Sequence, residues 1–251
     1  MTIQGIMFDF GWTLVDFVHD SHIATTRCIE ELEDFFQGHG FDLDSRVIFG
    51  DYFKEVHVLW QAGDALHYEY SASLALLRAL RRYVSQPDAA RLTDDFMVHS
   101  FESVISSWQL YPDTLDTLAA LRDAGYRLGC VSNTNDGHIT WSALDRNGLR
   151  SWLEPIYLSV DVGLRKPHPR IFQMALDDWG LRPDQAIMVG DNLKTDVMGA
   201  RNAGLRSVWI DQDTNHPWRR AEGSEASITP DATIRQLSEL PGLLAGAWGH
   251  S

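Results

Sequence analysis

The sequence predicts an α/β protein with a doubly wound, Rossmann-like parallel sheet as its core and an all-helical cap domain. Two observations favour this fold class. Short apolar strands alternate with helical segments over residues 110–251, whereas residues 17–109 show only helical periodicity. Strands and helices that alternate at this spacing pair in parallel through right-handed crossovers. We therefore expect a core made of residues 1–16 and 110–251, and a cap made of residues 17–109.

The first strand is predicted over residues 3–10, where the apolar run IQGIMFDF is typical of a buried strand. Apolar residues three and four apart then predict a series of helices up to Trp108. The segments with this spacing are residues 24–36, 49–60, 72–84 and 89–108. Because these segments contain no alternation of β-branched residues, we expect no strand among them.

Strands and helices alternate in the second half of the chain. The predicted strands are YRLGCVS (126–132), PIYLSV (155–160), QAIMVG (185–190) and RSVWID (206–211). The predicted helices are residues 113–125, 137–147, 168–180 and 193–203, and three of them run up to a glycine that can end a helix. The polar stretch 211–230 is predicted to be a loop, and residues 231–245 a last amphipathic helix.

Composition and net charge disfavour several classes of partner. The 251 residues are 44% hydrophobic and 22% charged, which is ordinary for a soluble globular protein. The formal net charge of −14 disfavours a nucleic acid or an anionic membrane as a partner. Two cysteines are too few for a disulfide framework. We expect a cytoplasmic protein that is monomeric or homodimeric.

Polar residues stand where several predicted strands end. They are Asp9, Ser132, Asn133, Lys166, Asp191 and Asp196. Taken singly, each has an ordinary explanation such as a turn or a helix cap. Ligands of open α/β sheets bind at the carboxyl ends of the strands, however, and all six fall at that edge. Carboxylates can hold Mg²⁺, and a hydroxyl, an N–H group and an ammonium can hold a phosphoryl group. The pattern indicates phosphoryl transfer to a carboxylate nucleophile.

The chain resembles the haloacid dehalogenase (HAD) superfamily, most members of which are Mg²⁺-dependent phosphohydrolases. FDFGWTL (8–14) resembles the first family motif, VSN (131–133) the second, RKPHPRIF (165–172) the third and VGDNLKTD (189–196) the fourth. The helical block resembles the cap that family members insert after the first motif. The resemblance spans nearly the whole chain, and it implies a phosphatase that acts on a small phosphorylated metabolite.

The resemblance also implies roles for the residues that bind phosphate. Asp9 would be the nucleophile and would form an aspartyl-phosphate. Ser132 and the backbone N–H of Asn133 would bind phosphoryl oxygens. Lys166 would bridge the phosphoryl group and the nucleophile.

A metal site follows from the same resemblance. Asp9, the backbone carbonyl of Gly11 and Asp191 would coordinate Mg²⁺. Asp196 would support the site from behind, and Thr13 would fix the loop after the first strand.

The chain departs from the family pattern at Gly11. Members usually carry a second Asp at this position, which acts as a general acid and then as a general base. The next position, commonly Gly, is Trp12. The metal site is compatible with Gly11, since residue 11 contributes only its carbonyl. The usual proton relay is not.

Several interpretations of Gly11 stay open. The enzyme can be a phosphatase in which water or another group handles the proton, or one that chooses substrates with good leaving groups. It can share the chemistry of phosphonoacetaldehyde hydrolases, which form a Schiff base with a cap lysine; Lys54 is the sole lysine in residues 17–109. It can share the chemistry of haloacid dehalogenases, although these dispense with Mg²⁺ and the fourth motif is intact here. It can also be a regulatory protein that keeps the phosphate and metal pocket. The cap aromatic residues Trp60, His67, Tyr68 and Tyr70 are candidates for the cavity lining.

Overall fold

The protein is described by a computed structural model that covers residues 2–18, 21–99, 101–212 and 227–248. Its centre is a parallel sheet of six strands in the order β5-β4-β1-β6-β7-β8. The strands are β1 (Gly5–Phe8), β4 (Arg127–Ser132), β5 (Ile156–Leu158), β6 (Ala186–Gly190), β7 (Arg206–Ile210) and β8 (Ala232–Ile234). The order runs outward from β1 in both directions, as in a doubly wound sheet, so the predicted fold class is confirmed.

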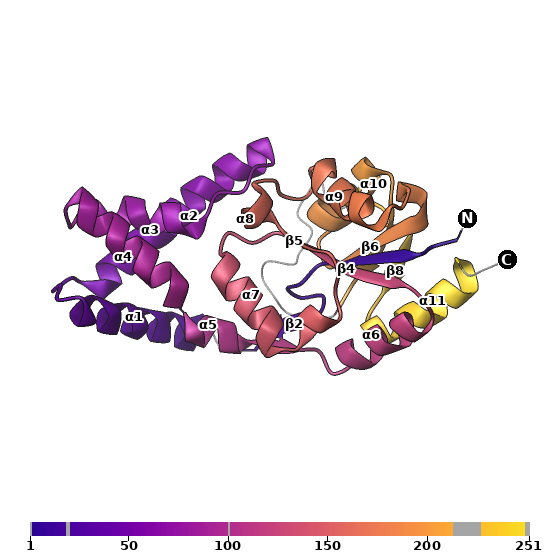
Figure 1. The fold of residues 1–251 in the computed structure, drawn as a ribbon, viewed down its shortest axis with the longest axis horizontal. Coiled ribbons are helices and arrows are strands. Elements are labelled where there is room, and N and C mark those ends of the chain that lie inside the picture. The colour runs from indigo at the N-terminus through magenta and orange to yellow at the C-terminus, as the bar shows by residue number, and fades with distance from the viewer. Residues whose placement is uncertain (1, 19–20, 100, 213–226, 249–251) are drawn as a thin grey trace.

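The sheet is buried on both faces, and β1 shows why. Ile6 and Phe8 point into one hydrophobic cluster, whereas Met7 points into another. Since successive side chains of a strand alternate between the two faces, a strand covered on both sides is apolar throughout. Helices cover both faces (Figure 1). One face carries α6 (Thr114–Asp123), α7 (Gly137–Arg146) and α11 (Leu240–Ala247); the other carries α9 (Pro169–Trp179) and α10 (Gly199–Ala203).

Between β1 and β4 the chain forms a helical segment at one end of the molecule (Figure 1). Its helices are α1 (Ser21–Gly38), α2 (Ser45–Leu66), α3 (Ala72–Leu80), α4 (Gln86–His99) and α5 (Glu102–Ser107). They enclose a hydrophobic cluster of their own, which includes Phe36, Leu76 and Leu92. A two-stranded antiparallel ribbon, β2 (Val15–Phe17) with β3 (Trp108–Leu110), lies where this segment leaves and rejoins the rest of the chain.

Some predicted elements were wrong in type. The strand β8 lies within residues 231–245, which were predicted to be one helix. Its Ala232–Ile234 stretch pairs with β7 and forms the edge strand of the sheet. A 3₁₀ turn follows at Leu237–Glu239, and the α-helix begins only at Leu240, with Pro241 in its first turn. The predicted helix 89–108 is interrupted at Phe101, whose φ is 59°. Of the predicted loop 211–230, residues 213–226 lie outside the described part of the chain.

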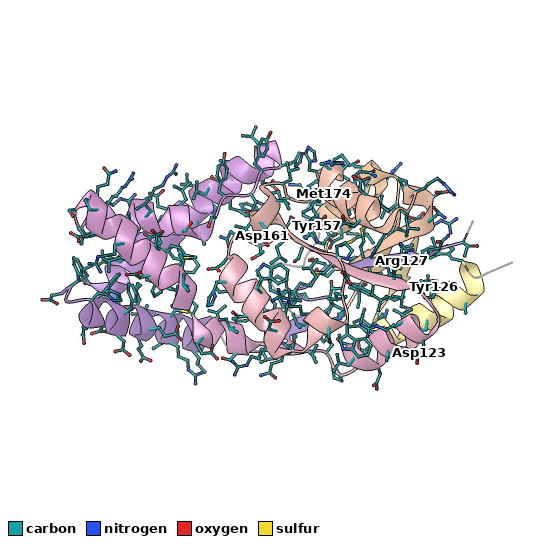
Figure 2. All side chains as sticks on the ribbon, in the orientation of Figure 1. Asp123, Tyr126, Arg127, Tyr157, Asp161 and Met174 are labelled. Atoms are coloured by element: carbon teal, nitrogen blue, oxygen red, sulfur yellow. The ribbon has the colours of Figure 1, made fainter. Side chains whose placement is uncertain are left out.

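Two more boundaries differ from the prediction. The strand predicted over 155–160 ends at Leu158, its last partner in β4 being Ser132, and a short helix α8 (Ser159–Val162) follows. The predicted helix 193–203 begins as a π-helix (Leu193–Met198) before α10. The Trp141 indole of α7 donates to Asp161 of α8 at 2.9 Å, and the Tyr157 hydroxyl of β5 donates to Asp178 of α9 at 2.7 Å. Figure 2 draws the side chains on the ribbon and labels Tyr157 and Asp161.

Among the described helices, none has the length and apolar character needed to cross a bilayer.

Candidate active site

Asp9 directly follows the central strand β1. Its backbone N–H donates to the carbonyl of Val189 in β6, at 2.9 Å, so the sheet fixes the backbone at this position. The carboxylate Oδ1 accepts a hydrogen bond of 2.7 Å from the N–H of Phe10. The side chain is 14% exposed, which leaves it accessible to a small molecule.

Asp191 directly follows the neighbouring strand β6. Its carbonyl accepts a 2.8 Å hydrogen bond from the indole of Trp209 in β7. The preceding residue, Gly190, lies against the side chain of Asp196. A Cβ at residue 190 would sit 2.3 Å from Cγ of Asp196, so only glycine fits here without a rearrangement.

Lys166 is buried between two carboxylates. Its Nζ lies 3.0 Å from Oδ1 of Asp9 and 2.6 Å from Oδ1 of Asp196. Burial by itself lowers the pKa of Lys166, but the charges of Asp196 and Asp9 outweigh it and the net shift of the pKa is upward. Lys166 is therefore an ammonium that bridges these two acids.

Asp196 is also buried, and both of its oxygens are engaged. Besides the contact with Lys166, Oδ2 accepts a 2.9 Å hydrogen bond from the N–H of Asn192. Burial raises the pKa of Asp196, and the Lys166 ammonium opposes that rise. An acid held in this way suits the supporting role expected for it.

Ser132 and Asn133 lie at the end of β4, next to β1, and both line the same cavity as Asp9. The Asn133 side chain clasps the backbone of Lys166: its Nδ2 donates to the Lys166 carbonyl at 2.9 Å, and its Oδ1 accepts from the Lys166 N–H at 2.8 Å. The side chain of Asn133 thus holds the third motif beside the second. Its backbone N–H is the group expected to bind phosphate.

The loop after Asp9 contains Gly11, Trp12 and Thr13. Trp12 has φ 53°, in the left-handed region where glycine is at ease, and its ring packs edge-on against Trp108 with centroids 5.3 Å apart. Thr13 is fully buried, and among the described residues its hydroxyl has no hydrogen-bond partner. Thr13 is therefore held in this loop by the packing of its side chain. Its role in fixing the loop stays a prediction, since the structure shows no hydrogen bond of its hydroxyl to a described residue.

The acids at this edge fit a divalent cation. Asp9, Asp191 and Asp196 each offer a carboxylate oxygen, and these three atoms lie within 4.8 Å of one another. Lys166 supplies one positive charge against three negative ones, so the group is left with an excess of negative charge. Hard oxygen donors of this kind are what Mg²⁺ prefers.

A cavity of about 380 Å³ opens beside Asp9, between the sheet edge and the helical segment. Of the cap aromatic residues named as candidates, Trp60 lines it, whereas His67, Tyr68 and Tyr70 are not among its lining residues. Several lining residues were not predicted from the sequence: Glu69, Trp108, Asp136 and Arg165. Only Arg165 carried a signal that could have found it, because it directly precedes Lys166.

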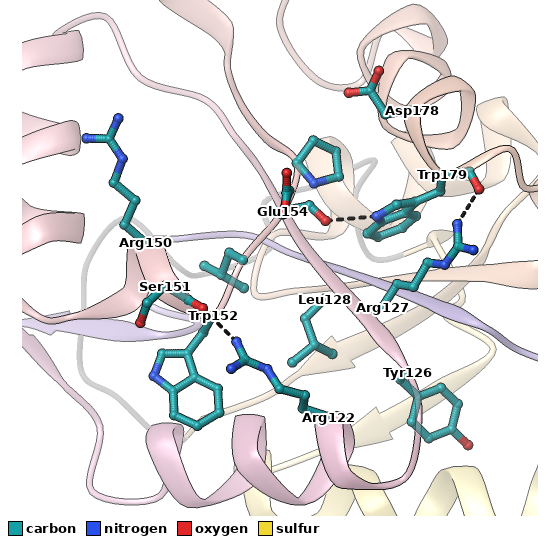
Figure 3. A pocket seen from close by; sticks show the side chains of 12 residues that line it. Arg122, Tyr126, Arg127, Leu128, Arg150, Ser151, Trp152, Glu154, Asp178 and Trp179 are labelled. Carbon is teal, nitrogen blue, oxygen red and sulfur yellow. Dashed lines mark hydrogen bonds between the residues drawn. The ribbon is translucent and has the colours of Figure 1, made fainter.

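A larger hollow of about 680 Å³ lies elsewhere, and Figure 3 shows it. Arg127, the first residue of β4, lines this hollow, whereas Ser132, the last residue of β4, lines the cavity beside Asp9. The hollow therefore lies toward the amino ends of the strands, away from Asp9. Its arginines already have protein partners: Arg122 donates to the Ser151 carbonyl at 2.8 Å, and Arg150 donates to Asp145 at 3.0 Å. We do not regard it as the reaction site.

Lys54 lies away from the cavity. Its side chain on α2 is 76% exposed and pairs with Asp51 at 2.8 Å, one turn earlier on the same helix. This position gives no support to a Schiff base formed by Lys54.

Comparison with known proteins agrees with the geometry. A family model described as haloacid dehalogenase-like hydrolase matches residues 3–204, and the chain belongs to this family of hydrolases. It is 34% identical to the glyceraldehyde 3-phosphate phosphatase of Methanothermobacter thermautotrophicus over 52% of this chain and 58% of the relative. It is 38% identical to the phosphoserine phosphatase of Thermus thermophilus over 53% of this chain and 50% of the relative. The chain thus spans about half the length of these two curated relatives.

A solved structure is similar over the whole chain. The crystal structure of a 2-haloacid dehalogenase from Pseudomonas syringae pv. Tomato DC3000 shares 25% identity, with a TM-score of 0.70 and coverage of 98% of this chain and 100% of that one.

Proposed function

We propose that this protein is a Mg²⁺-dependent phosphatase that acts on a small phosphorylated metabolite through an aspartyl-phosphate on Asp9. The observation that carries the proposal is the position of Lys166, buried between Asp9 and Asp196, beside three converging carboxylates. Residues 17–109 would serve as the cap that closes over the substrate.

The reaction would proceed in two displacements. An Asp9 oxygen attacks phosphorus, a carboxyl–phosphate bond forms, the bond to the leaving oxygen breaks, and the leaving oxygen takes a proton from solvent water. Water then attacks the same phosphorus and loses a proton to solvent, the carboxyl–phosphate bond breaks, and inorganic phosphate and the Asp9 carboxylate are formed. Ser132 and the Asn133 N–H would hold phosphoryl oxygens in both steps, and Lys166 would offset their negative charge.

Mg²⁺ would be held by Asp9, Asp191 and the Gly11 carbonyl, where it would offset charge on the phosphoryl group. Asp196 would stay bound to Lys166 and the Asn192 N–H, and so would orient the lysine. Lys166 would serve both Asp9 and the phosphoryl group, since an ammonium can donate three hydrogen bonds.

Asp9→Asn tests the proposal. The amide is nearly isosteric with the carboxylate but does not attack phosphorus, so hydrolysis of p-nitrophenyl phosphate should be lost. The fold and the thermal unfolding midpoint should stay close to those of the wild type. The exposed Asp123→Asn on α6 is the matched control and should keep full activity. Undiminished turnover in Asp9→Asn would contradict the covalent mechanism.

Dehalogenation is the second candidate, because the chain resembles a 2-haloacid dehalogenase over nearly its full length. The acid cluster argues against it, since such enzymes have no need of a divalent cation. Halide release from 2-chloropropionate in the presence of EDTA would favour dehalogenation over phosphate hydrolysis.

A further inference from the structure

Arg165 is a buried cation without an adequate protein partner. Its side chain is 7% exposed and lines the cavity that Asp9 also lines. Among the described residues, its Nε and Nη1 have no hydrogen-bond partner. A guanidinium stays charged at any ordinary pH, and buried N–H donors without acceptors are costly. A buried guanidinium whose Nε and Nη1 have no acceptor among the described residues, in the same cavity as Asp9, indicates that a bound ligand supplies the missing hydrogen-bond acceptors.

Glu69 satisfies Arg165 only in part. Its Oε2 lies 3.7 Å from Nε of Arg165, which is beyond hydrogen-bond distance, and the same oxygen accepts a 2.8 Å hydrogen bond from the Ser159 hydroxyl. Glu69 therefore lowers the electrostatic cost of burying the guanidinium but accepts no hydrogen bond from Nε or Nη1.

The side chain of Arg165 is not alone in joining the two parts of the molecule here. The backbone also does so: the Arg165 N–H donates to the His67 carbonyl at 3.1 Å, and Leu164 bridges to Tyr68. These backbone contacts would be kept by any residue other than proline at position 165. They therefore do not explain why a guanidinium is buried here.

The surroundings of Arg165 limit what can bind it. Its Cζ lies 5.8 Å from the ring centroid of Trp60, and the apolar side chains of Trp108 and Ile139 line the same cavity. The acids Glu69 and Asp136 line it too. A planar monoanion can accept two parallel hydrogen bonds from a guanidinium, whereas a second phosphate would bring more negative charge against these acids.

We propose that Arg165 binds a carboxylate on the phosphorylated substrate, so that the enzyme acts on a phosphorylated carboxylic acid. The proposal rests on the proposed phosphatase function for the position of the phosphate, beside Asp9. The carboxylate would accept hydrogen bonds from donors of Arg165 that have no acceptor among the described residues, and the substrate's phosphate and carboxylate would both be held in one cavity.

Binding measurements test this without turnover. The probes are ω-phosphonocarboxylates with one to four methylene groups, each paired with its primary amide, titrated calorimetrically into the Mg²⁺-loaded full chain. The series of lengths is needed because the spacing of the two groups is part of what is tested. For the wild type, at least one carboxylate should bind about tenfold or more tightly than its amide.

Substitution at residue 165 should remove that ratio. In Arg165→Met the carboxylate-to-amide ratio should fall to about one, with the amides binding as they do to the wild type. Arg165→Lys, which keeps the charge but not the planar fork, should retain only part of the preference for the carboxylate. It also provides a test that does not depend on the folding of the Met variant. Arg150→Met, in the other hollow, is the matched control and should keep the wild-type ratio.

Three outcomes would overturn the proposal: a ratio of one across the series in the wild type, an unchanged ratio in Arg165→Met, or tighter Arg165-dependent binding of the corresponding bisphosphonates. None of them bears on phosphatase activity, which is judged separately by hydrolysis of p-nitrophenyl phosphate.

Discussion

The indole of Trp108 stands where a side chain at residue 11 would project. A Cβ built on Gly11 would lie 3.2 Å from Cη2 of Trp108, and the backbone at Gly11 is outside the left-handed region that only glycine readily adopts. A side chain at residue 11 is therefore crowded but not forbidden. Trp108 itself packs against Phe10 and Phe17, with ring centroids 5.8 and 5.1 Å away.

The first prediction concerns leaving groups. General acid–base catalysis is worth about 10²–10⁴ in rate and matters most when the leaving oxygen is a poor one. Because Gly11 supplies no acid, turnover should fall steeply as the leaving-group pKa rises. Steady-state rates over a series from p-nitrophenyl and acyl phosphates to alkyl phosphates measure the slope. If alkyl phosphates turn over at about 10 s⁻¹, an ordinary enzyme rate, another residue carries the proton.

Asp136 is the residue to examine in that event. It lines the cavity, and burial raises the pKa of its carboxyl. Among the described residues its Oδ2 has no hydrogen-bond partner, whereas Oδ1 caps α7 by accepting from the Ile139 N–H. Asp136→Asn would keep the cap and remove the acid.

The second prediction restores the missing acid. Gly11→Asp should flatten the dependence on leaving-group pKa, by raising the rates for alkyl phosphates more than those for p-nitrophenyl phosphate. The Trp108 ring must give by a few tenths of an ångström for this to occur. Gly11→Asn, with the same bulk and no proton to give, is the control. Equal effects of the Asp and Asn variants on the slope would show that crowding alone was measured.

The third prediction concerns the metal. Asp191→Asn removes one of the converging carboxylates and should lower Mg²⁺ affinity and reduce kcat more than about 100-fold, since charge neutralisation by a metal is worth several kcal/mol. A titration of activity against Mg²⁺, with EDTA-treated wild type alongside, measures both effects. Full activity of the wild type in EDTA would rule out the metal-dependent mechanism.

The fourth prediction concerns stability. Gly190→Ala places a methyl group 2.3 Å from Cγ of Asp196, which forces the buried acid or the strand to shift. Overpacking of this kind costs about 1–3 kcal/mol, so the thermal unfolding midpoint should drop by several degrees. Gly50→Ala is the matched control: it lies in the exposed interior of α2 with nothing near its Cβ, and should be neutral or stabilising. Similar midpoints for the two variants would contradict the close approach.

The sequence by itself was enough to predict the doubly wound sheet and which residues follow its strands. Apolar runs that alternate with helical periodicity have few ways to bury both faces of a sheet, and parallel strands bring their carboxyl ends to one edge. Asp9, Ser132 and Asp191 could therefore be placed together before any coordinates. Local periodicity failed at residues 231–245, where pairing with the edge of β7 decides that Ala232–Ile234 is a strand.

Other features depend on contacts between residues far apart in the chain, so only the tertiary structure decided them. Trp108 lies against Gly11 although 97 positions separate them, and Glu69 meets Arg165 across the junction with the helical segment. No local pattern marks such pairs, because their contact depends on how the helical segment packs on the sheet. The same packing buries Arg165 and leaves its Nε and Nη1 without an acceptor among the described residues, which makes this arginine a candidate for recognising the substrate.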